Sequence, residues 1–154
     1  MLHECGPAEL SITTDPSRLD LDVIHGFLSG SYWAAGIPRE LVARAIRHST
    51  CFGAFDGSEQ VGFARVISDH ATFAYVCDVF VLASHRGRGV GKRLMAAIRS
   101  HPELQGLRRW VLFTRDAHEL YRQYGFTEAR QPERLMEIRS GPYPAAPIEG
   151  GDTA

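Results

Sequence analysis

The chain has 154 residues, of which 44% are hydrophobic and 23% are charged, and its formal net charge is −1 at pH 7. This length and composition predict one globular domain with a substantial core, and the balanced charge argues against a basic surface for nucleic acid or an anionic membrane. The chain contains three widely spaced cysteines without a CxxC pair, which predicts reduced thiols rather than a disulfide framework or a zinc site: Cys5, Cys51 and Cys77.

Neither a membrane anchor nor a secretion signal is predicted. No apolar run approaches the roughly 20 residues that span a bilayer, and the first residues lack the apolar core of a signal peptide. We therefore expect a cytoplasmic protein.

The first half of the chain predicts a strand, two helices and a hairpin. Asp15-Pro16 ends the first strand, and Gly57 lies in a loop of hairpin length. The expected elements, in chain order, are a strand at 9–14, a helix at about 19–28, a loop at 30–36, a helix from Pro38 to near Ser49, and antiparallel strands at 51–55 and 61–67.

The second half predicts a strand, a helix and a parallel strand, followed by a helix and two short strands. The longest apolar run is expected to be a central strand buried on both faces. Asp116 is expected to cap the last helix, and Gly125 to end it. The expected elements are a strand at 73–82, a helix at 94–98 that stops before Pro102, a strand at 109–114, a helix carrying Leu120 and Tyr121, and strands at 126–129 and 135–138. We expect a single domain over 1–140 and a disordered tail over 141–154.

A glycine-rich loop between the apolar run and the following helix is the most informative segment. Glycines alternate along it, so successive backbone N–H groups can converge on an anion at the positive end of the helix dipole. The loop lacks the first glycine and the hydroxyl residue of a Walker motif, and it lacks the last glycine of a dinucleotide fingerprint. Its sequence is Arg86-Gly87-Arg88-Gly89-Val90-Gly91-Lys92. We therefore expect it to bind a phosphate or a pyrophosphate.

The pattern R-x-x-G-x-G resembles the pyrophosphate-binding loop of the GNAT family of coenzyme A-dependent N-acetyltransferases. A second segment, Tyr121-Arg122-Gln123-Tyr124-Gly125-Phe126, is similar to the family's Y-x-x-x-G-F segment and follows the loop at the family's spacing. The resemblance covers about residues 9–139. It implies an α/β fold with a mixed, mostly antiparallel central sheet, a splayed parallel pair of strands and about four flanking helices.

The resemblance also implies where acetyl-CoA binds. The splayed strand would offer main-chain hydrogen bonds to the pantetheine arm and would polarise the thioester carbonyl. Thr114 stands where many relatives carry Asn, which weakens a side-chain contact to the cofactor there. The cofactor-binding residues implied are Val79, Phe80, Val81, Arg86, Gly87, Arg88, Gly89, Val90, Gly91, Lys92 and Thr114.

Two residues are candidates for catalysis. Tyr121 resembles the general acid that protonates the departing thiolate, and the alternative is a tyrosine packed in the core. Asp78 is a carboxylate inside an apolar strand, which suits a base or an anchor for the acceptor ammonium, and the alternative is an ion-paired structural carboxylate. Cys77 is expected to be an inert buried thiol.

The acceptor is expected to be a small-molecule or peptide primary amine. In the family, selectivity arises in the first two helices, their connection and the last hairpin, which here implicates Tyr32, Trp33, Glu133 and Arg134. No metal site, nucleic-acid partner or membrane partner is expected, and a homodimer is left open. The predicted function is acetyl-CoA-dependent N-acetylation by direct attack in a ternary complex. The alternatives are a non-catalytic coenzyme A-binding sensor and a nucleotide-binding regulator.

Overall fold

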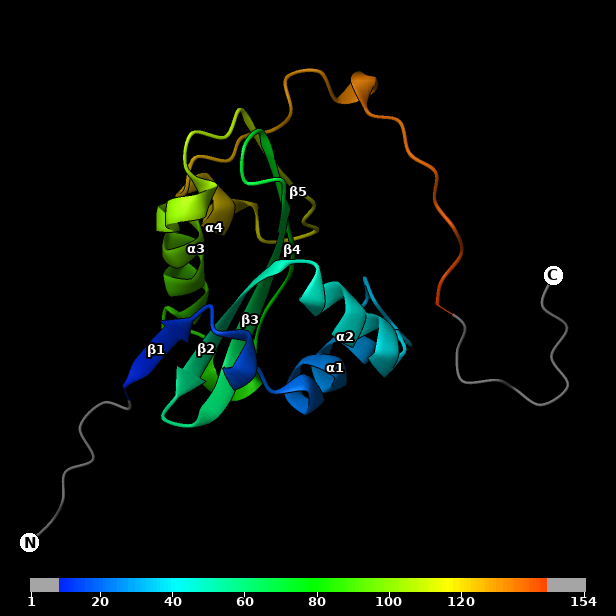
Figure 1. Cartoon of the computed structure of the whole chain (residues 1–154). Helices are drawn as coiled ribbons and strands as arrows, with labels where there is room; N and C mark the ends of the chain where they lie inside the picture. Colours follow the sequence, from blue (N-terminus) through cyan, green and yellow to red (C-terminus); the bar gives the residue numbers. More distant parts are fainter. Residues whose placement is uncertain (1–8, 144–154) are drawn as a thin grey trace, which may run out of the picture.

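In the computed structural model, which describes residues 9–143, five strands form one sheet in the order β1-β2-β3-β4-β5 (Figure 1). The strands are β1 (Leu10–Thr13), β2 (Thr50–Asp56), β3 (Glu59–Ser68), β4 (Phe73–Val81) and β5 (Arg109–Leu112). Neighbouring strands are antiparallel except β4 and β5, which are parallel. The expected mixed, mostly antiparallel sheet is confirmed.

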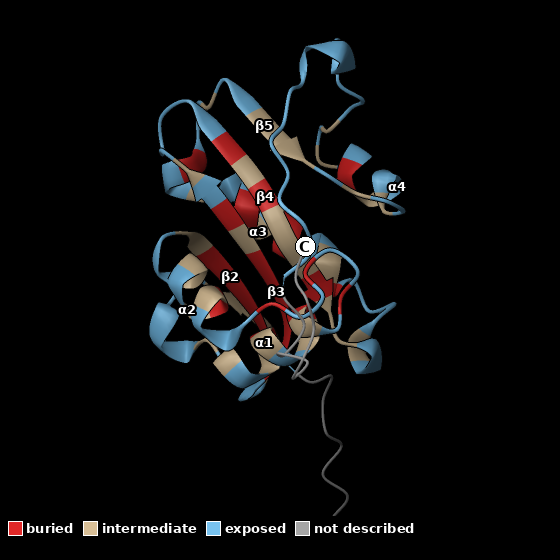
Figure 2. Cartoon of the chain, turned by 90° about the vertical axis from the view of Figure 1, so that its right-hand side faces the viewer, coloured by how far each residue is buried: buried red, intermediate tan, exposed pale blue. Residues whose placement is uncertain are grey.

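Four α-helices cover the two faces of this sheet: α1 (Leu21–Ser29), α2 (Arg39–Arg47), α3 (Val90–Ser100) and α4 (His118–Arg122). Figure 1 shows α1 and α2 on one face and α3 with α4 on the other. Because side chains alternate along each strand, the two faces build separate hydrophobic clusters. Figure 2 shows the buried residues running along the strands and the inner sides of the helices.

The cluster on the α3 side contains Leu94, Met95 and Ile98, which are fully buried against Phe52 and Val66 of the sheet. The cluster on the α1–α2 side contains Ile24, Leu28 and Val42 of the helices with Cys51, Phe63 and Phe80 of the strands. Burying one large aliphatic side chain stabilises the fold by about 1.5–3 kcal/mol, so each cluster fixes its helices firmly.

The parallel pair of strands is joined over only part of its length. Its ladder runs from Phe73 opposite Arg109 to Val76 opposite Leu112, whereas β4 continues to Val81. Beyond the ladder, β4 therefore keeps antiparallel partners in β3 and has none on the side of β5 among residues 9–143. This is the splayed pair that the resemblance implies.

A β-bulge lies in the free part of β4. Three steps on β4, from Cys77 to Phe80, oppose two steps on β3, from Phe63 to Arg65. Asp78 has a φ of 54°, in the left-handed region that Asp tolerates better than most residues. The extra residue turns the strand locally and re-aims the Asp78 side chain.

Several expected features differ from the structure. β4 is an interior strand, paired with β3 and β5 as expected, but its burial pattern shows that it is not buried on both faces. Residue Asp20 caps α1 through bonds from the N–H groups of Asp22 and Val23, so this helix begins at Leu21 and not near residue 19. Asp116 does not cap α4, because the Thr114 hydroxyl accepts the Ala117 N–H instead, at 2.9 Å.

The two strands expected near the C-terminus are also wrong. Residues 126–129 and 135–138 form no ladder with any described residue, and every residue from 127 to 143 is exposed. A strand needs a neighbouring strand for its backbone hydrogen bonds, and no described strand lies beside residues 126–129 or 135–138. Of the expected tail, residues 144–154 lie outside the described residues, as does Cys5.

Candidate active site

The glycine loop forms an open cradle at the start of α3. Gly87 and Gly89 have φ angles of 77° and 78°, which L side chains rarely adopt, and a Cβ added to either would meet no atom within 4 Å. Gly89 stands directly before the first residue of α3, so unpaired N–H groups of the first helical turn face the same space. An open space beside unpaired backbone donors is an arrangement that favours an anion.

The side chains of the loop divide between solvent and core. Arg88 and Lys92 are exposed, whereas Val90 is buried in the core, so Val90 can offer only its backbone to a ligand. Arg86 is exposed and donates from Nε to the Val81 carbonyl oxygen at 3.2 Å, which ties the loop to the end of β4.

The end of β4 lies next to this cradle. Phe80 is buried and stacks on Phe27 with ring centroids 4.1 Å apart, while Val79 and Val81 pack on the opposite cluster. Among residues 9–143, no backbone hydrogen bond joins residues 77–81 to β5 or to the loop after it. The backbone edge of these residues is therefore available to an extended ligand.

Two side chains hold the carboxylate of Asp78. The Trp33 indole donates from Nε1 to one carboxylate oxygen, and the Arg65 guanidinium donates from Nε to the other, both at 2.9 Å. The Asp78 and Arg65 side chains are only 12% and 17% exposed. Asp78 is thus ion-paired and also stands at the bend of β4, and each of its oxygens keeps a second lone pair for a ligand.

Arg65 connects this carboxylate to the end of α2. Its Nη1 donates to the Ser49 hydroxyl at 3.2 Å. Burial lowers the pKa of Arg65, but the opposing effects of Cys77 and Asp78 outweigh burial, and the pKa is raised overall. The guanidinium therefore remains charged at all relevant pH values.

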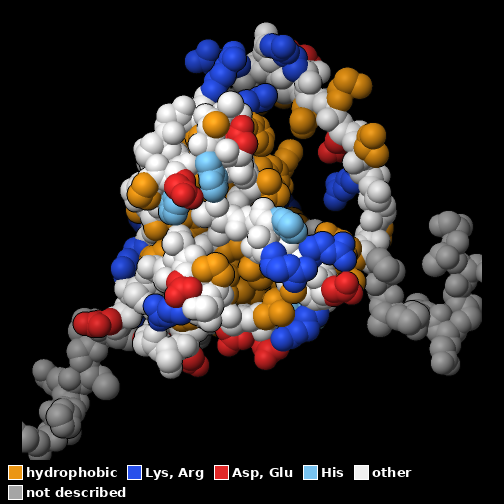
Figure 3. Space-filling view, viewed as in Figure 1, with side chains coloured by type: hydrophobic (Ala, Val, Ile, Leu, Met, Phe, Trp, Pro, Cys, Tyr) orange, Lys and Arg blue, Asp and Glu red, His pale blue; other side chains and the backbone are white. Residues whose placement is uncertain are grey.

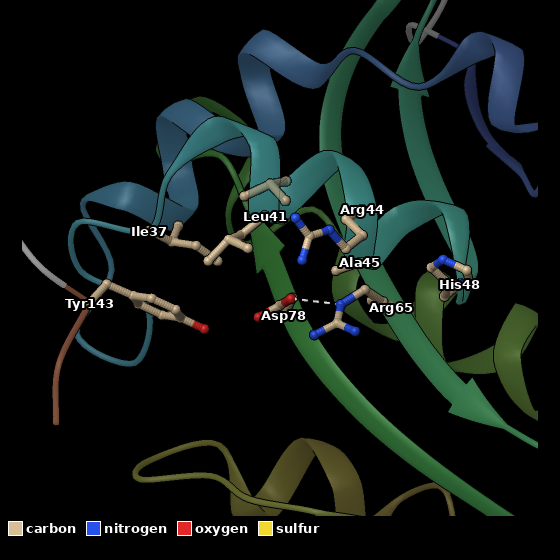
Figure 4. A pocket seen from close by; sticks show the side chains of 9 residues that line it. Ile37, Leu41, Arg44, Ala45, His48, Arg65, Asp78 and Tyr143 are labelled. Carbon is tan, nitrogen blue, oxygen red and sulfur yellow. Dashed lines mark hydrogen bonds and ion pairs between the residues drawn. The ribbon is translucent and has the colours of Figure 1, made fainter. Parts of the chain in front are cut away.

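A cavity of about 310 Å³ opens above the Asp78–Arg65 pair (Figure 4). Its apolar wall comes from α2 and the residues before it, and the Tyr143 ring closes the opposite side with its hydroxyl turned inward. The lining residues are Ile37, Leu41, Val42, Arg44, Ala45, His48, Arg65, Asp78 and Tyr143.

The predicted aromatic pair lies beside Asp78. Tyr32 and Trp33 meet edge to face with centroids 5.1 Å apart, and both remain partly exposed. The Arg115 guanidinium carbon lies 3.8 Å from the centre of the Tyr32 ring, a cation–π contact from the loop after β5. These contacts join the turn after α1 to the bulge of β4 and to the start of the α4 region.

Tyr121 is buried at the end of α4. Burial raises the pKa of Tyr121 to about 12, and the nearby Tyr32 and Asp116 add to this effect. Its hydroxyl has no hydrogen-bond partner in the part of the chain that the structure describes, whereas the hydroxyl of Tyr124 donates to the Lys92 carbonyl oxygen at 2.8 Å. Tyr121 therefore carries its proton at neutral pH and can give it to a ligand.

The described cysteines are free thiols, Cys51 and Cys77. Burial raises the pKa of each to about 12, against the opposing charge of Arg65. Neither thiol is a nucleophile at neutral pH, because almost none of it is thiolate.

The structure brings together most of the residues singled out from the sequence, with one exception. Asp78, Trp33 and Tyr32 form one connected group, and Tyr32 lies near enough to Tyr121 to contribute, after burial, to the raised pKa of Tyr121. Arg134 lies in a short helical turn with Glu133, hydrogen-bonded to Gln131, at the opposite end of the molecule from α1 and α2 in Figures 1 and 2.

Sequence reasoning missed four contributors to this group. Arg65 lies in an apolar strand, and a buried charge there was a signal for a partner. Arg44 and His48 are four residues apart on the α2 pattern, a spacing that places both on one helix face. Arg115 carried no sequence signal.

Residues 9–143 contain neither a helix suited to crossing a membrane nor a cluster suited to binding a metal ion. None of the helices there has the length and apolar character that a bilayer crossing requires. No group of three or more His, Cys, Asp or Glu side chains in this range is arranged to hold a metal ion.

Comparison with known proteins places this arrangement in a family. The model of the acetyltransferase (GNAT) domain matches residues 47–128, which includes β3, β4, the glycine loop and α4. A curated Gibberella zeae protein, provisionally named an acetyltransferase, is 33% identical over 151 residues, with 82% of this chain and 84% of the relative covered.

Solved structures of other proteins also resemble this chain. A Xanthomonas campestris crystal structure, provisionally assigned to the same family, has 56% identity and a TM-score of 0.84, with 88% of this chain and 96% of the other covered. A Deinococcus radiodurans structure with 24% identity and a TM-score of 0.67, covering 86% of this chain and 89% of the other, shares the fold. With the splayed β4, the glycine cradle and the family model in agreement, the chain belongs to the GNAT family of acetyltransferases.

Proposed function

We propose that this protein transfers the acetyl group of acetyl-CoA to a primary amine by direct attack in a ternary complex. The observation that carries the proposal is the placement of two ligand-binding features end to end. The free edge of β4 at residues 77–81 leads directly into the cradle of Gly87 and Gly89. An extended arm ending in a pyrophosphate, as in coenzyme A, matches this order of features.

The residues that would hold acetyl-CoA fit the molecule chemically. Backbone donors of the loop and the first turn of α3 suit the pyrophosphate, with Arg88 and Lys92 as exposed cations around it. The backbone of Val79, Phe80 and Val81 suits the amides of the pantetheine arm. When bound, acetyl-CoA supplies a thioester whose acetyl carbon accepts an amine and whose thiol leaves.

The protein's own groups would handle the protons. Tyr121 holds a proton at its hydroxyl, and we assign it as the donor to the departing thiolate, because its raised pKa keeps it neutral across the working range. Asp78 is already paired with Arg65, so we assign it as the anchor that orients the acceptor ammonium above the bulge rather than as an isolated base. The ammonium loses one proton to solvent before the neutral amine attacks, and the nitrogen loses a second as the amide forms, which replaces the proton that Tyr121 gives to the sulfur.

The acceptor would enter through the cavity on α2. Its volume of about 310 Å³ falls within the range of small-molecule sites, and Asp78 lies at its floor. Tyr32 and Trp33 would form the adjacent wall, because Trp33 already contacts Asp78.

Two measurements test the proposal. Calorimetry with acetyl-CoA, coenzyme A, ATP and NAD should show binding of the first two only. A free-thiol assay over a library of primary amines should then show turnover with at least one amine. Binding of ATP or NAD in preference to acetyl-CoA would overturn the proposed ligand, and acetyl-CoA binding without thiol release across the library would identify a sensor instead.

A further inference from the structure

The cavity above Asp78 carries more positive than negative charge. Three charged side chains line it: the guanidinium groups of Arg44 and Arg65 and the carboxylate of Asp78. The ion pair between Arg65 and Asp78, with 2.9 Å between Nε and Oδ2, balances one charge of each sign. The charge of Arg44 is left over within the cavity, so a ligand that carries an anionic group is favoured there.

Arg44 is available to such a group. Within the described residues, its ion-pair partner is Glu40 alone, one helical turn earlier and 3.3 Å away. The two side chains are 55% and 84% exposed, so solvent screening leaves this pair with little stabilising effect. Figure 4 shows the Arg44 side chain extending from α2 toward Asp78. A carboxylate of a ligand can therefore replace Glu40 and accept two parallel hydrogen bonds from the guanidinium.

The helix that forms this wall of the cavity is basic as a whole. α2 contains three arginines and a single glutamate, and His48 follows it directly. Figure 3 shows basic side chains and a histidine gathered over this part of the molecule. His48 also lines the cavity and can offer a ring N–H to an anion. The charge of α2 thus attracts an anion to the cavity and opposes a polycationic ligand such as a polyamine.

The rest of the wall on this side is apolar. It consists of the aliphatic side chains of Ile37, Leu41, Val42 and Ala45. The volume of about 310 Å³ lies at the small end of the range for ligand sites, which suits a molecule of a dozen or so heavy atoms. A ligand that fills this cavity therefore has an apolar body beside its charged groups.

We propose that the acceptor is a zwitterion, a free amino acid with an apolar side chain. Its ammonium meets the Asp78 carboxylate, its carboxylate meets the Arg44 guanidinium, and its side chain packs on the aliphatic wall of α2. This inference rests on the proposed function, because it names the acceptor of the same site. The nitrogen forms the new C–N bond as the C–S bond of the thioester breaks, and the products are the N-acetylamino acid, free coenzyme A and one proton.

The first test compares L-leucine with L-leucinamide in the free-thiol assay with acetyl-CoA. The two acceptors differ in one group, a carboxylate against a neutral amide of nearly the same shape. Leucinamide loses its amine proton more readily, so reactivity alone would favour it. We expect kcat/KM for leucine to be at least tenfold higher, because the carboxylate forms charge-assisted hydrogen bonds, and 1,4-diaminobutane should be weaker than either.

The second test assigns this preference to Arg44. Arg44→Gln removes the charge and keeps a polar side chain, so the ratio of kcat/KM for leucine to that for leucinamide should fall at least tenfold. A ratio measured within one variant does not depend on how much of the protein is folded. Arg47→Gln is the matched control, because Arg47 is an exposed arginine of the same helix and is not among the described residues that line the cavity. Its ratio should stay within about twofold of the wild-type value.

Several outcomes would overturn the zwitterionic acceptor and leave acetyl transfer in place. These are a wild-type preference for leucinamide or diaminobutane, an unchanged ratio in Arg44→Gln, and an equal fall of the ratio in Arg47→Gln.

Absence of thiol release with every amine would instead overturn the proposed function. Calorimetry of leucine with the coenzyme A-loaded protein then tests the site alone. Binding that Arg44→Gln weakens at least tenfold would support a site for a zwitterion. Absence of binding, or equal binding to the variant, would overturn it.

Discussion

Asp78 combines a backbone role with an electrostatic one. Its positive φ makes the bulge in β4, and its carboxylate binds Trp33 and Arg65, which are distant in sequence. One side chain therefore links the bulge to the aromatic pair, and Arg65 extends this link to Ser49, after α2. A substitution here acts on both folding and the site, so the two effects must be measured together.

Asp78→Asn tests the orientation of the acceptor. The amide keeps the shape and tolerates the left-handed backbone, but it removes the charge that faces Arg65. We expect kcat/KM for cationic amines to fall by at least tenfold and acetyl-CoA affinity to stay within about twofold, because the charge serves the acceptor rather than the cofactor.

Stability separates this role from a purely structural one. Leaving Arg65 buried without its partner costs about 3 kcal/mol, so the melting temperature should fall as well. Arg65→Met is the companion variant, because it breaks the same pair and keeps the carboxylate. If both variants lose stability and neither loses turnover, Asp78 is structural only.

Tyr121→Phe tests the proton donor. The ring packing is preserved and only the hydroxyl is lost, so kcat should fall about 10²-fold or more while acetyl-CoA binding persists. Because burial raises the pKa of Tyr121 to about 12, the wild-type donor remains protonated from pH 6 to 9 and its own titration should not shape that range. Single-turnover kinetics would report the chemical step directly.

Tyr124→Phe is the matched control. It removes the same atom from the turn after α4, and it loses only a hydrogen bond to the Lys92 carbonyl oxygen. Its kcat should stay close to the wild-type value. An equal loss of kcat in the two variants would assign the effect to the packing of α4.

At the level of elements, the glycine cradle makes a prediction about acetyl-CoA affinity. Gly89→Val places a side chain in the open space before α3, where the phosphates would approach the backbone. Losing one or two bonds to a charged phosphate is worth about 1.5–3 kcal/mol each, so affinity should drop by at least tenfold in calorimetry.

Gly57→Val controls for backbone strain. Gly57 has a similar positive φ of 60° and open space around it, but it lies in the β2–β3 turn. Both variants should lose similar stability, while only Gly89→Val should lose affinity. Wild-type affinity in folded Gly89→Val would remove the loop from the cofactor site.

The β3–β4 turn makes a prediction about acid stability. The Asp69 carboxylate accepts from the Thr72 hydroxyl at 2.6 Å and from the N–H groups of Ala71, Thr72 and Phe73, and these bonds hold the pKa of Asp69 well below its usual value. A lowered folded-state pKa stabilises the protein above the unfolded pKa near 3.8, and this stability is lost as the pH falls further.

The melting temperature of the wild-type chain should therefore fall more steeply below about pH 4 than that of Asp69→Asn, which cannot titrate there. Glu59→Gln, which removes an exposed carboxylate of β3, should keep the wild-type slope. Parallel pH profiles for the wild-type chain and Asp69→Asn would show that the turn bonds do not contribute.

The sequence predicted correctly those elements that depend on residues close together in the chain. The turn glycines, the apolar faces of α2 and α3 and the hairpin of β2 and β3 depend on nearby residues, and each is present in the structure. The cap of α4 was misassigned to Asp116 because the helix begins one residue later, with Ala117 at the N-cap and no side-chain cap bond, while the Ala117 N–H donates to the Thr114 hydroxyl. The strand at 135–138 was misassigned because alternation shows a preference for pairing, whereas pairing itself requires a neighbouring edge.

For the molecule as a whole, the motifs indicated the region of the site but not its connections. The glycine loop and the Tyr121 segment are contiguous, so the sequence displays them directly. The contacts of Asp78 with Trp33 and Arg65 depend on the bulge in β4, and no sequence pattern predicted that bulge. The cavity is lined by residues of α2, β3, β4 and Tyr143, which are far apart in the sequence, so only the three-dimensional structure reveals it.

The separation of the two hydrophobic clusters has a consequence for how such a protein diverges. The sheet divides the packing of α1 and α2 from that of α3 and α4, and the cradle lies with the second pair. On the proposed function, replacements that reshape the α1–α2 layer would alter the acceptor side and leave the opposite layer, with the cradle, intact. Grafting this layer from a relative is then expected to change the acceptor while acetyl-CoA affinity is kept.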